Sequence, residues 1–322
     1  MPDKRDDDEP KQIAAATPKI DQLSAIKRRR LESSVSIADN PREAITYQHT
    51  VLCQTSLPYR DPGDSVRIWE RQQGAVSLRV EAGSVRDPVV HRFVNVGLPY
   101  GSRPRLILAH LNREALLHGS PRIEVEDSLT AFIKRVVPEN SSPRGVEIRR
   151  FKDQLSRLAA ALVRMAVDLS VDRAYQVNTH IIDAFELWLG KDDRQRVLWP
   201  SVVELSPRYY DTLIKHAVPL DERAIGALAN SPMALDVYAW LAQRLCRIRP
   251  KREQFVPWTA LQAQFGAGYG QIRDFRRHFR AVLAAVHLQY RGAKFDLDDH
   301  GMTLRYSLPP IPGRHLDLIK DD

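Results

Sequence analysis

Residues 271–286 read Gln-Ile-Arg-Asp-Phe-Arg-Arg-His-Phe-Arg-Ala-Val-Leu-Ala-Ala-Val, and they form two distinct faces when wound into a helix at about 100° per residue. One face is apolar and consists of Ile272, Phe275, Phe279, Val282, Leu283 and Val286. An adjacent stripe consists of Arg273, Arg276, Arg277 and Arg280. A core face beside a guanidinium face is typical of a helix that reads a DNA groove. An ordinary amphipathic helix with a solvated basic face has the same pattern.

The segments around this helix predict a winged helix-turn-helix unit. A helix begins at Ser231-Pro-Met and runs to Leu245, and a short helix runs from Phe255 to about Phe265. The turn Gly266-Ala-Gly-Tyr-Gly270 then leads into residues 271–286. Strands that supply the wing are expected at 289–290, 294–297 and 304–308.

The first half of the chain repeats this order. Alternation of apolar and polar residues predicts a β-hairpin over 66–80, and a further strand is expected at 92–96. Helices are predicted over 105–118, 127–136 and 146–167, followed by a strand pair at 166–171 and 174–178. The expected fold is therefore α+β, mainly helical, with two tandem winged helix-turn-helix domains that carry β-hairpin wings.

These patterns divide the chain into four segments. Residues 1–46 contain nine bases and nine acids with few aromatics, and we expect a disordered polar arm there. Residues 47–200 form the first winged-helix domain, whose hairpin would support dimerisation and DNA backbone contact. Residues 201–314 form the second, main DNA-binding domain, and residues 315–322 form a tail.

Charge indicates the kind of partner. The 322-residue chain has a net charge of +8, and residues 241–291 alone contain ten bases and two acids. So concentrated an excess favours a nucleic-acid footprint over a device for solubility. The expected DNA contacts are Arg149, Arg150, Lys152, Gln154 and Arg157 in the first unit, and Tyr269, Gln271, Arg273, Arg276, Arg277 and Arg280 in the second.

Motifs for catalysis or cofactor binding are not found in the sequence. No two histidines are separated by one residue, as a metal site of a DNA-nicking enzyme would need, so core packing explains Tyr209-Tyr210 better than a nucleophile does. The glycines at 266–270 are not followed by Gly-Lys-Ser/Thr, so we expect no nucleotide site. Cys53 and Cys246 are interpreted as buried small hydrophobes.

We therefore expect a protein without enzymatic activity, metal or cofactor. We also expect it in the cytoplasm, away from membranes and associated with plasmid DNA in the nucleoid.

Several segments resemble the plasmid-encoded RepA replication initiators of bacteria. They are Leu98-Pro-Tyr-Gly-Ser, Arg105-Leu-Ile-Leu, Ser128-Leu-Thr-Ala-Phe, Gln154-Leu-Ser-Arg-Leu, Ser231-Pro-Met-Ala-Leu-Asp-Val-Tyr-Ala-Trp-Leu-Ala-Gln-Arg-Leu245, Phe275-Arg-Arg-His-Phe and Ser307-Leu-Pro-Pro. The likeness covers roughly residues 47–310.

The resemblance implies an initiator that binds double-stranded DNA at repeated sites (iterons) in a plasmid origin. It further implies origin opening, recruitment of the host initiator and helicase, copy-number control and a possible homodimer. Two other functions remain open: a transcriptional regulator on the same fold, and an origin-nicking enzyme.

Overall fold

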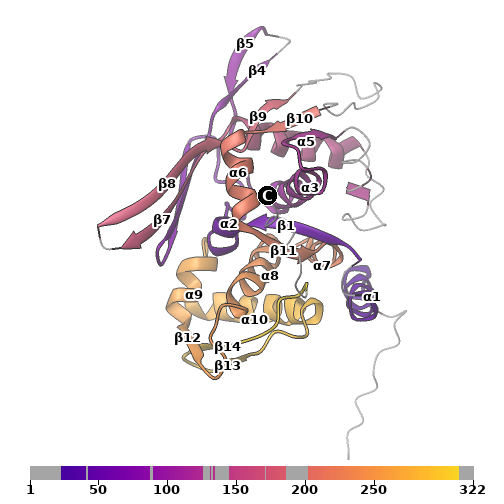
Figure 1. Cartoon of the computed structure of the whole chain (residues 1–322), viewed down its shortest axis with the longest axis vertical. Helices are drawn as coiled ribbons and strands as arrows, with labels where there is room; N and C mark the ends of the chain where they lie inside the picture. Colours follow the sequence, from indigo (N-terminus) through magenta and orange to yellow (C-terminus); the bar gives the residue numbers. More distant parts are fainter. Residues whose placement is uncertain are drawn as a thin grey trace, which may run out of the picture.

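The computed structural model describes residues 23–40, 43–87, 90–125, 131, 133–134, 145–170, 172–185 and 202–311 (Figure 1). Helices and antiparallel sheets alternate along this part of the chain, which confirms the α+β class. Three of our predictions lie mostly or wholly outside it: the outer part of the arm, most of the helix at 127–136, and the tail at 315–322.

The first half is built on a four-stranded sheet of order β2-β3-β7-β8. Its strands are β2 (Ile68–Gln73), β3 (Val76–Glu81), β7 (Leu162–Ser170) and β8 (Arg173–His180). Both predicted hairpins are confirmed, and β3 joins them by pairing with β7. Alternate residues of β3 are buried, because successive side chains of a strand point to opposite faces of the sheet.

Helix α5 (Gly145–Ala160) ends earlier than predicted. We expected a helix to Val167, but the chain leaves the helix at Ala161 and enters β7. Val163 and Met165 are buried at a spacing of two, and residues 162–167 pair with β3. Sheet pairing thus prevails over the helical spacing of the apolar residues.

The remaining elements of the first half flank this sheet. β4 (Ser84–Asp87) and β5 (Arg92–Asn95) form a hairpin that projects at one end of the molecule (Figure 1). α3 (Ser102–His118) contains the predicted helix and packs on α5. A small sheet of order β6-β10-β9 contains β6 (Arg122–Glu124), β10 (Val202–Leu205) and β9 (Ile182–Phe185), and α6 (Pro207–His216) follows it.

The inner part of the predicted disordered arm is ordered, which corrects that expectation. Residues 25–39 form α1 (Ala25–Asp39), which packs against α7 (Glu222–Leu228) and α10 (Ile272–Gln289). The Arg223 guanidinium donates to the Ser36 carbonyl at 2.9 Å and to the Asn40 carbonyl at 2.7 Å. Helix α1 is therefore held by polar contacts with residues far away in the sequence, which local composition does not reveal.

The second half places helices on a three-stranded sheet. The elements are α8 (Pro232–Leu245), β12 (Glu253–Pro257), α9 (Trp258–Phe265), α10, β13 (Phe295–Leu297) and β14 (Gly301–Arg305), with sheet order β12-β14-β13. Ser231 caps α8 as predicted, because its hydroxyl accepts from the Ala234 N–H at 3.2 Å.

Three predicted boundaries in this half were wrong. Residues 255–257 continue β12, and the helix begins only at Trp258. Gln289 ends α10 and Tyr290 caps it, so these two residues form no strand. The last strand begins at Gly301 and ends at Arg305, because it pairs with both β12 and β13.

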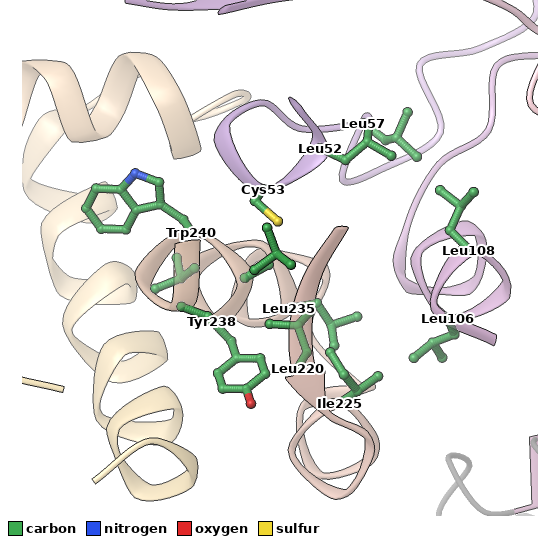
Figure 2. Packing of buried hydrophobic residues seen from close by; sticks show 14 of the residues in the cluster. Leu52, Cys53, Leu57, Leu106, Leu108, Leu220, Ile225, Leu235, Tyr238 and Trp240 are labelled. Atoms are coloured by element: carbon green, nitrogen blue, oxygen red, sulfur yellow. The ribbon is translucent and has the colours of Figure 1, made fainter. Parts of the chain in front are cut away.

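Packing crosses the predicted domain boundary at residue 200. β1 (Ile45–His49) pairs with β11 (Ala217–Asp221), and α2 (Thr50–Gln54) packs on α8. Figure 2 shows buried side chains of α2, α3, β11, α7 and α8 gathered in one hydrophobic cluster. The two halves therefore share a continuous core.

A buried ion pair fixes α3 against α8 inside this core. The Arg105 guanidinium donates to the two carboxylate oxygens of Asp236 at 2.6 and 2.7 Å. It also donates to the carbonyls of Leu57 and Gly101 at 2.8 and 2.7 Å. Arg105 and Asp236 are only 5% and 7% exposed, so neither charge has water as an alternative partner.

We expect Asp236→Ala to destabilise the fold by about 3–5 kcal/mol, because it leaves the Arg105 charge buried and unpaired. Urea unfolding followed by circular dichroism measures this change. The control is Asp274→Ala, which breaks an exposed pair with Arg277 and should cost less than about 1 kcal/mol. Equal costs for the two variants would contradict the role of the buried pair.

The buried His49 side chain makes stability depend on pH. Its Nδ1 accepts from the Val51 N–H at 3.2 Å, and burial, followed by the nearby His216, lowers the pKa of His49 to about 3. The unfolded chain takes up a proton near the ordinary pKa of 6.5, whereas the folded chain does so only near 3. The stabilisation is therefore present above pH 6.5 and is lost as the pH falls towards 3.

His49→Asn keeps a side-chain acceptor for the Val51 N–H and removes the titration. Between pH 7 and 5 we expect the wild type to lose about 2 kcal/mol more unfolding free energy than this variant. Urea titrations at the two pH values measure the difference. The exposed His91→Asn should behave as the wild type does. An unchanged slope in His49→Asn would contradict the assignment.

Candidate nucleic-acid interface

The inner face of α10 packs on aromatic rings of α9. Phe275 and Phe279 are fully buried, and their rings lie edge-on to Trp258 with centroids 6.4 and 6.0 Å away. Phe265 packs on Phe279 at 5.7 Å. Edge-to-face aromatic packing of this kind fixes the rotation of α10 about its axis. The predicted core face of residues 271–286 is thus confirmed.

The arginine stripe lies beside this core face and reaches the solvent. Arg273, Arg277 and Arg280 are exposed, and Arg276 is half-buried. The Arg277 side chain is 82% exposed and, among the residues that the structure describes, its ion pair is with Asp274 at 3.2 Å. Because four arginines outnumber this one carboxylate, the stripe presents a positive surface on one side of the helix.

The ring of Trp258 contacts the guanidinium groups of two of these arginines. The guanidinium carbons of Arg276 and Arg280 lie 5.3 and 5.5 Å from the centroid of the Trp258 ring. Both are within the range of a cation–π interaction, which limits the directions that the two side chains can take. The Trp258 Nε1–H donates to the Asp298 carbonyl at 3.0 Å, so the indole itself is held in place.

The turn before α10 depends on glycine and on a stacked pair of rings. Gly268 has φ +90°, a conformation that residues with a side chain rarely adopt. Tyr269 stacks on His278 at 5.8 Å, and partial burial raises the pKa of the Tyr269 phenol. Gln271 is exposed immediately before the helix begins. Tyr269 and Gln271 therefore lie at the same end of α10 as the arginines.

The tip between β13 and β14 is acidic. The Asp298 carboxylate accepts the backbone N–H groups of Gly301 and His300, both at 2.7 Å, and these bonds lower the pKa of Asp298. Asp296 and Asp299 lie within the same hairpin. Asp296 pairs with Arg305, and the exposed arginines lie on α10, so α10 rather than the hairpin carries the concentrated positive charge.

The predicted contacts of the first unit are not gathered into a comparable stripe. Gln154 is 3% exposed, and its Oε1 accepts from the Tyr100 N–H at 2.8 Å. Arg157 is largely buried, pairs with Asp153 and lies over the Tyr100 ring at 5.3 Å. Both side chains hold the loop at 97–100 and present little surface to a ligand, and their contact with DNA stays an untested prediction.

The other three residues predicted on α5 keep some exposure. Arg149 and Arg150 are exposed, and Arg150 pairs with Glu147 at 2.7 Å. Lys152 is half-buried, and burial lowers the pKa of its amine. As DNA contacts, these three residues remain a prediction.

The tyrosines and cysteines mostly follow the core interpretation. Tyr209 is fully buried and donates to Asn112 Oδ1 at 3.0 Å, while Tyr210 is half-buried. Cys53 is buried, whereas Cys246 is only half-buried because it caps the end of α8.

The described residues contain no group of three His, Cys, Asp or Glu placed to hold a metal ion. Within that same part of the chain, no helix has both the length and the apolar character of a membrane span.

Sequence reasoning missed the role of Trp258. Its ring supports the arginines from another helix, and no spacing within 271–286 points to it. A signal was nevertheless available, because a tryptophan at the start of the short helix is a large apolar side chain that can pack on the next helix.

Comparison with known proteins supports the class that the fold and the basic helix suggest. Residues 98–259, about half of the chain, match the family described as "Plasmid encoded RepA protein". The chain belongs to this family of plasmid replication initiators. No curated protein matches the sequence.

The comparison with solved structures matches two of RctB domains 2 and 3. One shares 10% identity with a TM-score of 0.48 and covers 80% of this chain and 98% of that chain. A second shares 11% identity with a TM-score of 0.46 and covers 79% and 94%.

We expect Gln154→Ala to cost about 1–3 kcal/mol of unfolding free energy, because it leaves the Tyr100 N–H without its acceptor. Arg277→Ala should change stability by less than about 0.5 kcal/mol, because the side chain is exposed. Urea unfolding of both variants measures the contrast. A stability loss in Arg277→Ala as large as that in Gln154→Ala would contradict these assignments.

Proposed function

We propose that this protein initiates plasmid replication by binding repeated sites in the plasmid origin through helix α10. Bound copies would help to open the origin, recruit the host initiator and helicase, and set the copy number. Membership of the RepA family supports the role at an origin. The observation that carries the DNA contact is the exposed arginine stripe on a helix whose rotation is fixed by the aromatic core.

The order of elements in the second half supports a winged-helix interpretation. Helix α8, strand β12, helices α9 and α10, and the hairpin β13–β14 follow one another, and β14 lies between β12 and β13 in the sheet. In helix-turn-helix proteins the second helix of the motif enters the major groove. In this chain that helix is α10.

Each arginine of the stripe has two possible partners on DNA. A guanidinium can bind guanine O6 and N7 together, which discriminates by about 1–3 kcal/mol, or it can neutralise a phosphate. Arg276 and Arg280 are directed by Trp258, which suits a fixed partner. Arg273 and Arg277 are exposed to solvent and can adapt to either partner.

A role for the first unit is less well supported than one for α10. Arg149, Arg150 and Lys152 are the remaining candidates for backbone contacts on α5. Dimerisation through the β2–β3 hairpin stays a prediction, and β2 lies at one of the two edges of its sheet.

We also propose that the protein acts without cleaving DNA. A nicking tyrosine must reach a phosphate, whereas the Tyr209 ring is fully buried and its hydroxyl is bonded to Asn112. Burial raises the pKa of Tyr209, which works against a phenolate nucleophile. A transcriptional regulator remains the second candidate, since the same helix could read an inverted repeat in a promoter.

Binding to a duplex that contains one direct repeat of the origin tests the proposal. We expect Arg273→Ala with Arg277→Ala to weaken binding at least tenfold, because two cations leave the groove-facing helix. If both contact phosphate, the slope of log K against log salt should fall by about 1.8. A relaxed preference at one base pair would instead identify a base contact. Fluorescence anisotropy at several salt concentrations measures both quantities.

The control for charge alone is Arg122→Ala on β6, an exposed arginine away from α10. It should bind like the wild type. Replication of a plasmid whose only origin requires this gene separates the initiator from the regulator. A wild-type protein that is expressed yet neither prefers the repeat nor supports replication would overturn the proposal.

A further inference from the structure

The positive charge of residues 241–291 is divided between two surfaces. One part forms the stripe on α10. The other lies in the loop that joins α8 to β12, where four cations are exposed: Arg247, Arg249, Lys251 and Arg252. We name residues 247–252 the basic loop. It contains four cations and no acid, whereas one of the four arginines of the stripe is paired with Asp274.

The basic loop has a defined shape. Ile248 is 3% exposed and anchors the loop in the core, so its neighbours on both sides point outwards. Backbone bonds from Arg247 N–H to the Arg244 carbonyl at 3.1 Å and from Arg252 N–H to the Arg249 carbonyl at 3.0 Å close two successive turns. Ordered turns hold the four charges near one another, which costs free energy by repulsion.

Lys251 adds backbone strain to this repulsion. Its φ is +68°, the left-handed region that residues with a side chain other than asparagine or aspartate seldom occupy. Glycine would adopt this conformation without strain. A lysine in such a position is expected where its charge serves a purpose.

No carboxylate among the described residues pairs with the four cations of the loop. Glu253 is next in sequence, but its carboxylate pairs with Arg305 across the sheet at 2.6 Å. The four exposed cations are therefore available to an anionic ligand. The local density of four cations in six residues fits closely spaced negative charges, such as those of a nucleic-acid backbone.

The basic loop and the arginine stripe lie at opposite ends of β12. The loop leads into Glu253, which pairs with Arg305, whereas Pro257 at the other end pairs with Gly301 and is followed by Trp258. At about 3.3 Å per residue, β12 separates the two ends by about 13 Å. The major groove is about 12 Å wide, so a loop at this distance can reach phosphates that border the groove entered by α10.

We propose that the basic loop binds phosphates of the same DNA duplex, on the flank of the base pairs that α10 reads. The inference rests on the proposed function and adds a second contact surface to it. The loop contributes affinity without base preference, since it meets only the backbone.

The test variant combines Arg249→Gln, Lys251→Asn and Arg252→Gln. Asparagine tolerates left-handed backbone, so the loop should keep its shape while three charges are removed. The matched control removes three exposed arginines that lie on strands of the first half of the chain: Arg86→Gln, Arg92→Gln and Arg122→Gln. Circular dichroism verifies that both variants remain folded.

Each protein is titrated against two duplexes, one trimmed to the base pairs that α10 contacts and one extended by about one helical turn on each side. The wild type should bind the extended duplex at least tenfold more tightly. The loop variant should lose this gain, bind the trimmed duplex within about twofold of the wild type, and show a salt slope lower by up to about 2.7 on the extended duplex. The control variant should behave as the wild type does.

Three results would overturn the inference. One is an unchanged gain from the flanks in the loop variant, as expected if the loop binds a protein instead. Another is a loop variant that binds both duplexes as the wild type does but no longer holds two separate duplexes in one complex. That result would assign the loop to a second DNA molecule. A third is equal loss in the control variant. A wild type without preference for the repeat would instead overturn the proposed function, which keeps the two failures distinct.

Discussion

The bidentate ion pair between Arg105 and Asp236 joins the two halves of this chain. Arg105 lies on α3, Asp236 lies on α8, and the same guanidinium also holds the carbonyls of Leu57 and Gly101. A buried charge pair tolerates little displacement, because each partner has lost its hydration. Helix α8 in turn packs on α10 and shares the core of the second half. The position of α10 relative to the first half therefore depends on this contact.

Near the surface of α10, aromatic packing rather than an ion pair positions the side chains. Trp258 lies between the buried phenylalanines of α10 and the guanidinium groups above them, so one ring contributes to the core and also directs the surface charges. The tip of the β13–β14 hairpin carries acidic residues. These features give α10 an exposed and oriented cationic face, which is why we propose it as the element that faces DNA, with the basic loop beyond the other end of β12.

Regular patterns in the sequence predicted a large part of this arrangement. The apolar repeat of residues 271–286, the cap at Ser231 and the alternation over 66–80 are local signals, and each lies in the predicted element. The failures concern long-range contacts. Helix α1 is held by Arg223, about 190 residues away, and β7 is a strand because it pairs with β3. Gln154 carries the side chain of a base reader, yet the loop at Tyr100 buries it. The charge excess was located correctly along the chain, but its division into two surfaces required the fold.

The most direct measurement is the structure of the protein bound to a duplex that carries one origin repeat. The account predicts the N-terminal half of α10 in the major groove, with arginines of the stripe bonded to base edges or phosphates and Trp258 still supporting Arg276 and Arg280. A complex in which DNA binds elsewhere and α10 faces the solvent would contradict it.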